Sequence, residues 1–347
     1  MAGRKHHFIP QFLQRGFATS RGNEWHAFAH FKDRAVGLNI RNFGAQRDFY
    51  GEPGDTEIDD AITSYEFKAA SLINELRVQK SNVEISDDGI ADLVSHLEMR
   101  SRASRLHMAN FLSEVWQWAI ETLTDQNQLA MLLRSVLHEN PRLVEREVSK
   151  SLLTVEQKRR AVEQVNASLS PYMDFVIEDI CRNLHQTLTS QPTQSEAKVK
   201  EIQLKNLRKD ILNPKRSAIY SSLRYRIVDV KFDVFLPDCM IFFQYDREWT
   251  PIFLAPGQLR CILFPISNSR YVVGSQIGYD PKIKGAQPKL VSCCYEAFLS
   301  AKNTPTQRLL AKGIAGREGN AFRAARDELT QMFFNMFSGS EAQVPQA

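Results

Sequence analysis

The sequence predicts an α+β fold: a small mixed region at the amino terminus, a mainly helical middle, and a β-rich carboxy-terminal sheet with a final helix. Three observations predict it. Apolar residues recur at helical spacing through most of residues 56–190. From residue 227 onward, short runs rich in β-branched and aromatic residues alternate with Pro, Gly or Asn. The first 55 residues carry short patterns of both kinds and end in a turn-forming GEPGD sequence.

Residues 1–55 are expected to form the mixed region. The apolar pattern over residues 8–17 predicts a short helix. Apolar and polar residues alternate over residues 24–32, which predicts a strand. Residues 39–43 are expected to supply its partner strand.

Residues 56–190 are predicted to be helical, beginning with a regular apolar stripe over residues 56–79. Ser86 is expected to cap a second, long helix that reaches Trp116, because two acidic residues follow it where the positive end of a helix favours them. Further helices are predicted over residues 125–138, 141–149 and 154–189, with Pro141 and Pro171 as breaks or first-turn residues.

The rest of the chain divides into three predicted parts. Residues 191–226 form a connection with a short helix that ends near Asn213 and Pro214. Residues 227–337 contain the β-rich part and a final helix over about residues 316–337. Its strands are expected in the sequences IVDVKFDVFL, CMIFFQY, CILFPI and YVVGSQI. Residues 338–347 are expected to form a flexible tail.

Composition and charge are those of an ordinary globular protein. Of the 347 residues, 43% are hydrophobic and 24% are charged, which argues against disorder along the whole chain. The 44 basic residues nearly balance the 40 acidic ones, so the formal charge is only +4. This excess does not by itself argue for a nucleic-acid partner, although a local basic surface is compatible with it.

Membrane and redox signals predict a cytoplasmic protein without a membrane partner. No apolar run approaches the roughly 18–20 residues that cross a bilayer, and the start of the chain lacks the pattern of a secretory signal. The five cysteines are sparse, odd in number and without a CxxC pair. Neither a disulfide framework nor a structural zinc site is therefore expected.

The densest polar motif lies in residues 5–18, which read KHHFIPQFLQRGFA. This run resembles the opening signature of the domain of unknown function 4238 family, in which a His-His pair, a proline, a glutamine and an arginine precede an aromatic residue. A weaker match follows at residues 47–50, and then an acidic helix. The resemblance implies the same α+β layout and a role in bacterial defence against phage. The matching positions are His6, His7, Pro10, Gln11, Arg15 and Phe17, with Glu57 and Glu66 on the acidic helix.

The adjacent histidines also resemble the start of an HNH-type nuclease motif. That similarity implies His6 as a ligand of a divalent metal ion and His7 as the base that activates water. Asn23 would orient the base, and His30 would be a further ligand. Because His30 falls on a predicted strand, whereas the motif needs a later ligand on a helix, the full match is not expected. A metal-independent hydrolase that uses the same cluster is an alternative.

A structural interpretation of the motif is the other alternative. His6 and His7 would then cap the following helix or pair with buried acids, and Arg15 would form an ion pair with Glu57 or Glu66. In the catalytic interpretation, Gln11 and Arg15 follow the histidines by one and two helical turns and contact a phosphate or support the imidazoles.

Two further arginines are candidates for binding a substrate. Arg102 and Arg105 are three residues apart on a predicted helix, so they share a face that could meet phosphate. The alternative is a solvated charged face with internal pairs. The partner implied by the catalytic interpretation is DNA or RNA.

Two functional hypotheses follow from the sequence. The leading one is a phage-defence effector that acts on nucleic acid by phosphodiester hydrolysis, with His6 and His7 at its centre. The competing one is a non-enzymatic sensor or protein-interaction module in which the His-His motif is structural. The sequence leaves the substrate, the metal, the trigger and the oligomeric state open.

Overall fold

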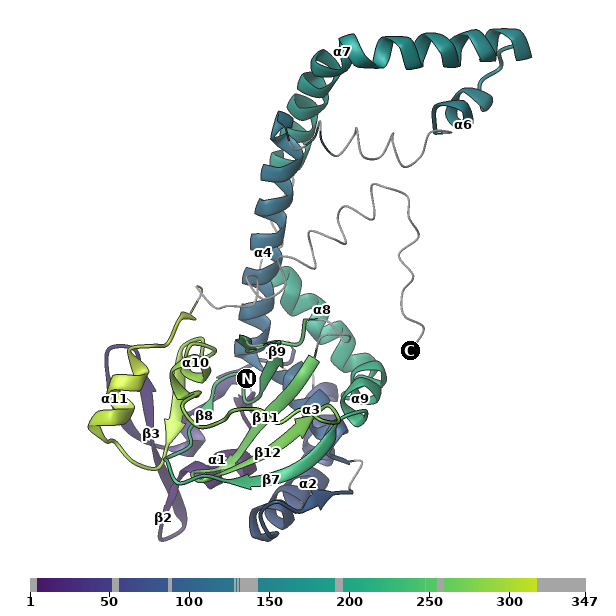
Figure 1. Cartoon of the computed structure of the whole chain (residues 1–347). Helices are drawn as coiled ribbons and strands as arrows, with labels where there is room; N and C mark the ends of the chain where they lie inside the picture. The colour runs from purple at the N-terminus through teal and green to yellow at the C-terminus, as the bar shows by residue number, and fades with distance from the viewer. Residues whose placement is uncertain are drawn as a thin grey trace. The chain divides into compact units, whose positions relative to one another are not determined.

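The computed structural model describes residues 5–51, 56–86, 89–127, 129, 131, 143–190, 196–246, 248–254 and 259–316, and it confirms the α+β class (Figure 1). The chain divides into two compact units. The first is built from residues 1–111 and 194–324, and the second from residues 112–193 and 325–347. The strands and the predicted site residues lie in the first unit.

A six-stranded antiparallel sheet in the first unit has the order β10-β9-β11-β12-β7-β6. Nearly every residue of β11 is buried, which is the pattern of a strand covered on both faces. The strands are β6 (Glu84–Ile85), β7 (Arg224–Asp229), β9 (Phe242–Tyr245), β10 (Glu248–Thr250), β11 (Leu259–Ser267) and β12 (Arg270–Ser275).

A second sheet joins strands from opposite ends of the described sequence. Its order is β2-β3-β13-β8, and β4 pairs with β3. Phe28 to Phe31 pair antiparallel with Ala297 to Ser300. The strands are β2 (Thr19–Arg21), β3 (Glu24–Phe31), β4 (Ala35–Asn39), β8 (Leu236–Pro237) and β13 (Ala297–Ser300). The amino-terminal and carboxy-terminal patterns therefore build one sheet, and one apolar core runs under both large sheets.

The motif region forms a small element of its own. β1 (Lys5–His7) pairs antiparallel with β5 (Ala45–Arg47), so that His6 lies opposite Gln46. The helix α1 (Gln11–Gln14) and a 3-10 turn, η1 (Arg15–Phe17), follow. The two ends of this region are joined by Gln14, whose amide donates to the carbonyl oxygens of Ile9 at 2.7 Å and Phe43 at 3.1 Å.

Helices cover the sheets of the first unit. Arg77 of α2 donates to the Ile266 carbonyl oxygen of β11 at 2.8 Å and to the Phe12 and Leu13 carbonyl oxygens of α1 at 3.0 Å each. It therefore ties the motif region to the large sheet. These helices are α2 (Glu57–Val78), α3 (Gly89–Arg100), the start of α4 (Arg102–Thr124), α8 (Glu196–Lys209), α9 (Pro214–Ser221), α10 (Gln287–Val291) and α11 (Pro305–Ala311).

The second unit contains the remainder of α4 with α6 (Leu143–Ser149) and α7 (Val155–Ser190). α7 confirms the helix predicted over residues 154–189 and continues through Pro171, which was expected to be a break or a first-turn residue. All five cysteines of the chain are free and buried, so no disulfide joins any of them.

Several predicted elements are confirmed, and others need correction. β3 and α2 match the predictions for residues 24–32 and 56–79. The partner of β3 is β4, because residues 40–42 form a 3-10 turn (η2, Ile40–Asn42) that Asn39 caps by accepting from the Arg41 N–H at 3.0 Å. The helix predicted over residues 8–17 is restricted to α1 and η1.

The long helix predicted from Ser86 to Trp116 is in fact two helices. The Ser101 side chain accepts the Ser104 N–H at 3.1 Å and donates to the Asp238 carbonyl oxygen at 3.3 Å. A serine that accepts the N–H of the residue three positions later is an N-cap, so α3 ends and a separate helix, α4, begins at this point. Similarly, Asn213 caps α9 and Pro214 occupies its first turn, so this pair begins a helix where the end of one was predicted.

Other predictions fall outside the described residues. The final helix over residues 316–337 does so from residue 317 onward, as do the tail at residues 338–347 and the connection at residues 191–195. Most of the helix predicted over residues 125–138 does as well. The division of the sequence into five regions stays a prediction.

Candidate functional site

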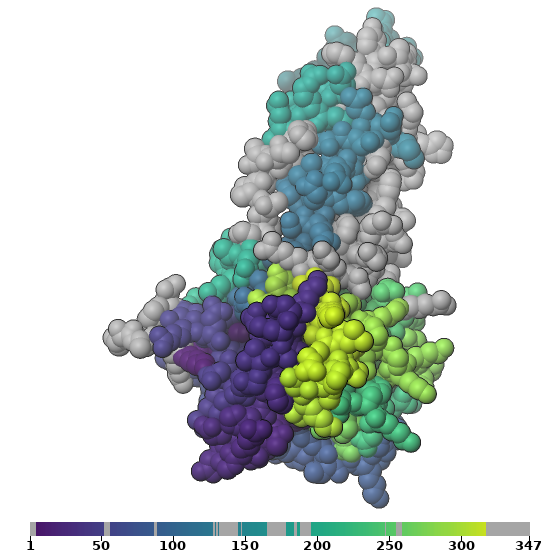
Figure 2. All heavy atoms as spheres, turned by 90° about the vertical axis from the view of Figure 1, so that its left-hand side faces the viewer, coloured from purple at the N-terminus to yellow at the C-terminus, as the bar shows by residue number. Residues whose placement is uncertain are grey.

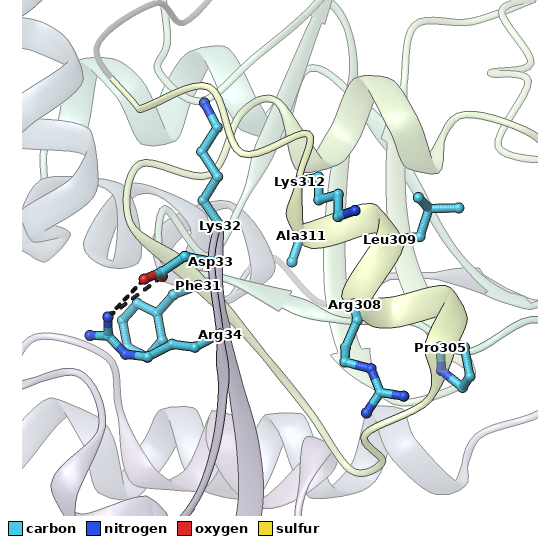
Figure 3. A pocket seen from close by; sticks show the side chains of 9 residues that line it. All are labelled: Phe31, Lys32, Asp33, Arg34, Pro305, Arg308, Leu309, Ala311 and Lys312. Atoms are coloured by element: carbon cyan, nitrogen blue, oxygen red, sulfur yellow. Dashed lines mark hydrogen bonds and ion pairs between the residues drawn. The ribbon is translucent and has the colours of Figure 1, made fainter.

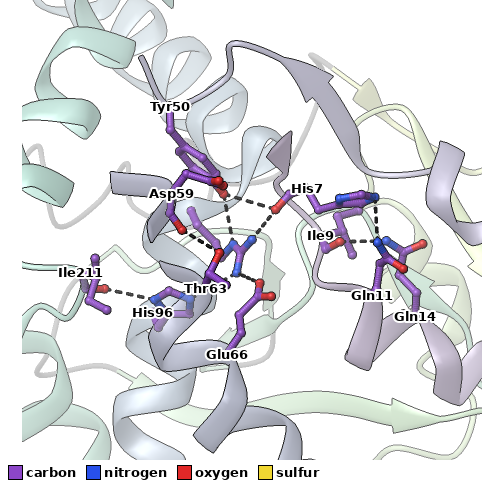
Figure 4. Close-up of polar contacts among 11 residues, drawn as sticks. His7, Ile9, Gln11, Gln14, Tyr50, Asp59, Thr63, Glu66, His96 and Ile211 are labelled. Atoms are coloured by element: carbon purple, nitrogen blue, oxygen red, sulfur yellow. Dashed lines mark hydrogen bonds and ion pairs between the residues drawn. The ribbon is translucent and has the colours of Figure 1, made fainter. Parts of the chain in front are cut away.

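Arg100, the last residue of α3, contacts the His-His motif, Tyr50 and α2. Figure 4 labels its partners His7, Tyr50, Glu66 and His96. Arg100 is only 1% exposed. Its guanidinium donates from Nη2 to the His7 carbonyl oxygen and from Nη1 to the Glu66 carboxylate of α2. Nε donates to the Tyr50 hydroxyl at 3.1 Å, and Nη1 lies 3.3 Å from Nε2 of His96. We call Arg100, Glu66, Tyr50 and His96 the arginine cluster.

The charges of the arginine cluster follow from burial and pairing. Burial disfavours a charged guanidinium, but Tyr50 and Glu66 more than offset this and raise the pKa of Arg100. Burial, with a smaller effect from Arg100, lowers the pKa of His96 to about 3. His96 is therefore neutral at pH 7: its Nδ1 donates to the Ile211 carbonyl oxygen at 3.2 Å, and its Nε2 accepts from Arg100. The cluster holds one buried cation against one carboxylate.

His6 is enclosed within the protein. The residue is 2% exposed, and its ring stacks on that of Tyr50 with the centroids 5.4 Å apart. Nδ1 accepts the Tyr50 N–H at 3.2 Å, so Nε2 carries the proton. Among the residues that the structure describes, this buried Nε2 has no hydrogen-bond partner. The weak sequence match at residues 47–50 thus packs directly against the His-His motif.

His7 is only partly buried and has a different environment. Its Nε2 lies 3.2 Å from the Arg41 carbonyl oxygen and 3.4 Å from Nε2 of Gln11. A carbonyl can only accept, so Nε2 carries the proton and Nδ1 keeps its lone pair. Burial lowers the pKa of His7, and the bond to Arg41 offsets part of that effect. The imidazole is therefore neutral at pH 7 and held in one orientation, which is the arrangement of a general base.

The other predicted site residues lie apart from the arginine cluster. Arg15 is exposed on η1, beside Arg77, and the partner of Glu66 is Arg100 rather than Arg15. Asn23 is exposed in the turn between β2 and β3. His30 is buried in β3, where Nε2 lies 2.9 Å from the Ser300 hydroxyl and 3.2 Å from the Lys302 carbonyl oxygen. The structure therefore brings His6, His7, Gln11 and Glu66 together and leaves Arg15, Asn23 and His30 outside this group.

Arg102 and Arg105 are both engaged by the protein's own groups. Arg102 pairs with Glu296 at 2.8 Å. Arg105 is buried: its guanidinium lies 4.6 Å from the centroid of the Phe49 ring, donates to Gln203 at 3.3 Å, and lies 3.7 Å from a carboxylate oxygen of Glu196. The two side chains do not present a shared, exposed face.

Sequence reasoning missed Arg100 as the centre of the site. A signal was present, because Leu93, Leu97 and Arg100 follow one another at spacings of four and three residues and so share one face of α3. A charged residue on an otherwise apolar helix face is buried with a partner or faces a site. The contact with the His7 carbonyl oxygen was not foreseeable, since it joins residues 93 positions apart.

A divalent metal would need donors that converge. Within the described parts of the chain, no group of three or more His, Cys, Asp or Glu side chains is placed to hold a metal ion. His6, the predicted ligand, faces Tyr50.

The described helices also include none that is long and apolar enough to cross a membrane.

The fold and site define an α+β protein whose amino-terminal His-His motif is fixed to a helical layer through a buried arginine. The family model described as "Protein of unknown function (DUF4238)" matches residues 5–287. The chain therefore belongs to this family, and the resemblance inferred from the motif is confirmed. No curated protein and no solved structure gives a significant match.

Proposed function

We propose that this chain is a phage-defence sensor or interaction protein that acts by binding a partner and not by catalysis. We propose also that its His-His motif is a structural clasp, a segment that holds β1 to the helices of the first unit. The observation that carries the proposal is the contact of buried Arg100 with the His7 carbonyl oxygen, Tyr50 and Glu66. The backbone of the motif is thereby bound to the rest of the first unit by a buried side chain. The defence role is what the family resemblance implies, and the cytoplasmic location is the expectation from the membrane and cysteine patterns of the sequence; both are part of the proposal.

The environment of His6 supports the same conclusion. A catalytic or metal-binding imidazole needs access to a substrate or to further ligands. His6 instead stacks on Tyr50 and accepts its N–H inside the protein. This use of the ring satisfies a backbone donor and fixes the position of β1.

Phosphodiester hydrolysis is the second candidate, and one specific observation favours it. His7 is neutral, partly exposed and oriented by the Arg41 carbonyl oxygen. In such a reaction Nδ1 of His7 would take a proton from water as the water oxygen attacks phosphorus and the P–O bond to the leaving group breaks. A divalent metal ion would stabilise the charge on the phosphate, and His6 would have to turn away from Tyr50 to bind it.

The test compares purified wild type, His7→Ala and the control His26→Ala on labelled DNA, messenger RNA and transfer RNA, with magnesium, manganese or chelator. His26 is matched because its imidazole is also partly exposed and bonds to an exposed group, Glu24, at 3.3 Å. Under the clasp proposal, no protein cleaves any substrate. Cleavage by wild type and His26→Ala but not by an equally stable His7→Ala would overturn it and establish the hydrolase.

The defence role has a separate test. Cells that express the wild-type chain are challenged with a panel of phages, and plaques are counted against an empty vector. Protection that is lost in a destabilised Arg100 variant and kept in His7→Ala supports the clasp proposal. Protection that depends on His7 at unchanged protein abundance contradicts it.

A further inference from the structure

A basic cleft lies on the first unit, and none of its lining residues belongs to the His-His motif. It has a volume of about 400 Å³ and is formed by the turn after β3 and by α11 (Figure 3). Figure 2 shows that these segments, purple and yellow, lie side by side on one face. The cleft is lined by four cationic side chains and one acidic one: Lys32, Arg34, Arg308, Lys312 and Asp33.

The positive charges in the cleft are poorly compensated. Asp33 pairs with its neighbour Arg34 at 3.2 Å, and both side chains are exposed. Arg308 donates to Asn303 at 3.3 Å, which is a neutral partner. Among the described residues, no carboxylate pairs with Lys32, Arg308 or Lys312. Arg308 of α11 and Lys312, the C-cap residue of that helix, are four residues apart, a spacing at which like charges repel.

A flat surface lies at the edge of the cleft, where Figure 3 shows the Phe31 and Arg34 side chains pointing away from α11. The guanidinium of Arg34 lies over the Phe31 ring, 4.8 Å from its centroid, and the Arg34 side chain is 63% exposed. On the α11 side, Leu309 is an exposed apolar residue at 67%. Nucleobases stack on aromatic rings and on guanidinium planes, whereas a carboxylate pairs with the edge of a guanidinium and does not need its flat face.

Both walls are held in place before any ligand arrives. Phe31 belongs to β3, which β4 and β13 pair on opposite sides. α11 begins with a capping box, in which Thr304 accepts the Gln307 N–H at 3.3 Å and Gln307 accepts the Thr304 N–H at 3.0 Å. Arg308 therefore projects from a capped helix, and Lys32 and Arg34 project from a tight turn that the Phe31 N–H closes by donating to the Arg34 carbonyl oxygen at 2.8 Å. A backbone fixed before binding lowers the entropic cost of binding.

We propose that this cleft binds single-stranded nucleic acid. The phosphates lie against Lys32, Arg308 and Lys312, and a base stacks on the Arg34 guanidinium. This inference goes beyond the proposed function, because it names a ligand class and a site that the clasp residues do not form.

The test measures binding of a fluorescent oligo-deoxythymidine and an oligo-uridine by anisotropy over a range of salt concentrations. The triple variant Lys32→Gln, Arg308→Gln and Lys312→Gln removes three charges from the cleft. The control Lys231→Gln, Lys282→Gln and Lys284→Gln removes three exposed charges elsewhere on the same unit. We expect the cleft variant to bind about tenfold or more weakly and to lose a slope of about 2 in log K against log salt, while the control stays near wild type.

Arg34→Lys separates stacking from charge, because lysine keeps the charge and lacks the planar group. We expect it to weaken single-strand binding by about fivefold or more. Equal binding of polyglutamate or of a duplex, with no effect of Arg34→Lys, would show a generic anion surface and overturn the inference. Equal loss in the cleft and control variants would do so too. Neither result bears on the clasp, which is tested by the Tm of motif variants.

Discussion

The guanidinium of Arg100 donates to the backbone carbonyl oxygen of His7, which fixes the end of α3 to the first strand. The contact depends on the main chain of residue 7, whereas the imidazole makes a separate contact with the Arg41 carbonyl oxygen. A motif that is conspicuous in the sequence for its imidazoles is thus held through its backbone. The structural importance of the motif and the chemistry of the His7 ring can therefore be separated by mutation.

Arg100→Met is expected to destabilise the protein strongly. It leaves the Glu66 carboxylate and the His7 carbonyl oxygen without their cation, and the loss of one partner from a buried pair costs about 3–5 kcal/mol. The matched control is Arg102→Met, because Arg102 makes a partly exposed ion pair with Glu296, which is worth about 1 kcal/mol or less. Urea unfolding measures both, and equal losses would refute the central role of Arg100.

His6→Ala is expected to cost more stability than His7→Ala. The first variant leaves the buried Tyr50 N–H unpaired, at about 1–3 kcal/mol, and opens a cavity beside its ring. His7 is partly exposed, so water replaces its side-chain contacts. Thermal unfolding of both variants gives the order of their Tm values. A lower Tm for His7→Ala would mean that the side chain of residue 7, and not its backbone, carries the clasp.

Acid is expected to weaken the fold through His96 and His107. Burial lowers the pKa of His107 to about 4 and that of His96 to about 3, whereas both titrate near 6.5 when unfolded. Between pH 6.5 and about 4 the unfolded chain binds more protons, so stability is fully present above pH 6.5 and is lost as pH falls. Each unit of pKa difference corresponds to about 1.4 kcal/mol.

The variant His107→Gln isolates this effect, since glutamine can still donate to the Cys293 carbonyl oxygen but does not titrate. Asp238 acts in the opposite direction, because burial raises its pKa from 3.8 to about 6. Because Asp238 is present in both proteins, its contribution cancels in the difference between the unfolding free energies of wild type and His107→Gln. Urea unfolding at pH 7, 5.5 and 4.5 should show a shallower loss in the variant, and parallel curves would contradict the assignment.

Gly44→Ala is expected to destabilise the motif region more than Gly22→Ala does. Both glycines have positive φ, +60° and +62°, so an alanine costs about 1–2 kcal/mol in backbone strain at either position. At Gly44 the added Cβ would also lie 2.5 Å from Cβ of Ile9, whereas at Gly22 nothing lies within 4 Å. The difference between the two free energies of unfolding measures this steric conflict, and equal values would contradict it.

The local parts of the fold were predictable from the sequence, because their signals are local. β3 and α2 show regular periodicity over 8 and 22 residues and match their predictions. The break at Ser101 was missed, since the apolar pattern continues through it and only the side-chain contact to Asp238 shows the new start. The pair Asn213 and Pro214 is compatible with the end of one helix and with the start of another. The structure shows the start, because Asn213 caps α9 by accepting the Arg216 N–H.

The candidate site was predictable only in part. The motif and the match at residues 47–50 are in contact, and Glu66 joins them. The structural interpretation of the motif paired Arg15 with Glu57 or Glu66, but the partner of Glu66 is the buried Arg100. A buried ion pair needs a cation that the surrounding core can enclose, and that property depends on tertiary packing rather than on spacing.

The second sheet has a consequence for synthesis of the protein. The edge of β3 that β13 covers stays open until residue 300 has left the ribosome. At typical translation rates this takes on the order of 10–50 seconds after β3 itself has emerged. An open strand edge can pair with another nascent chain, so this interval is when the polypeptide is most exposed to aggregation. Chaperone demand should therefore fall sharply once the segment containing β13 is made.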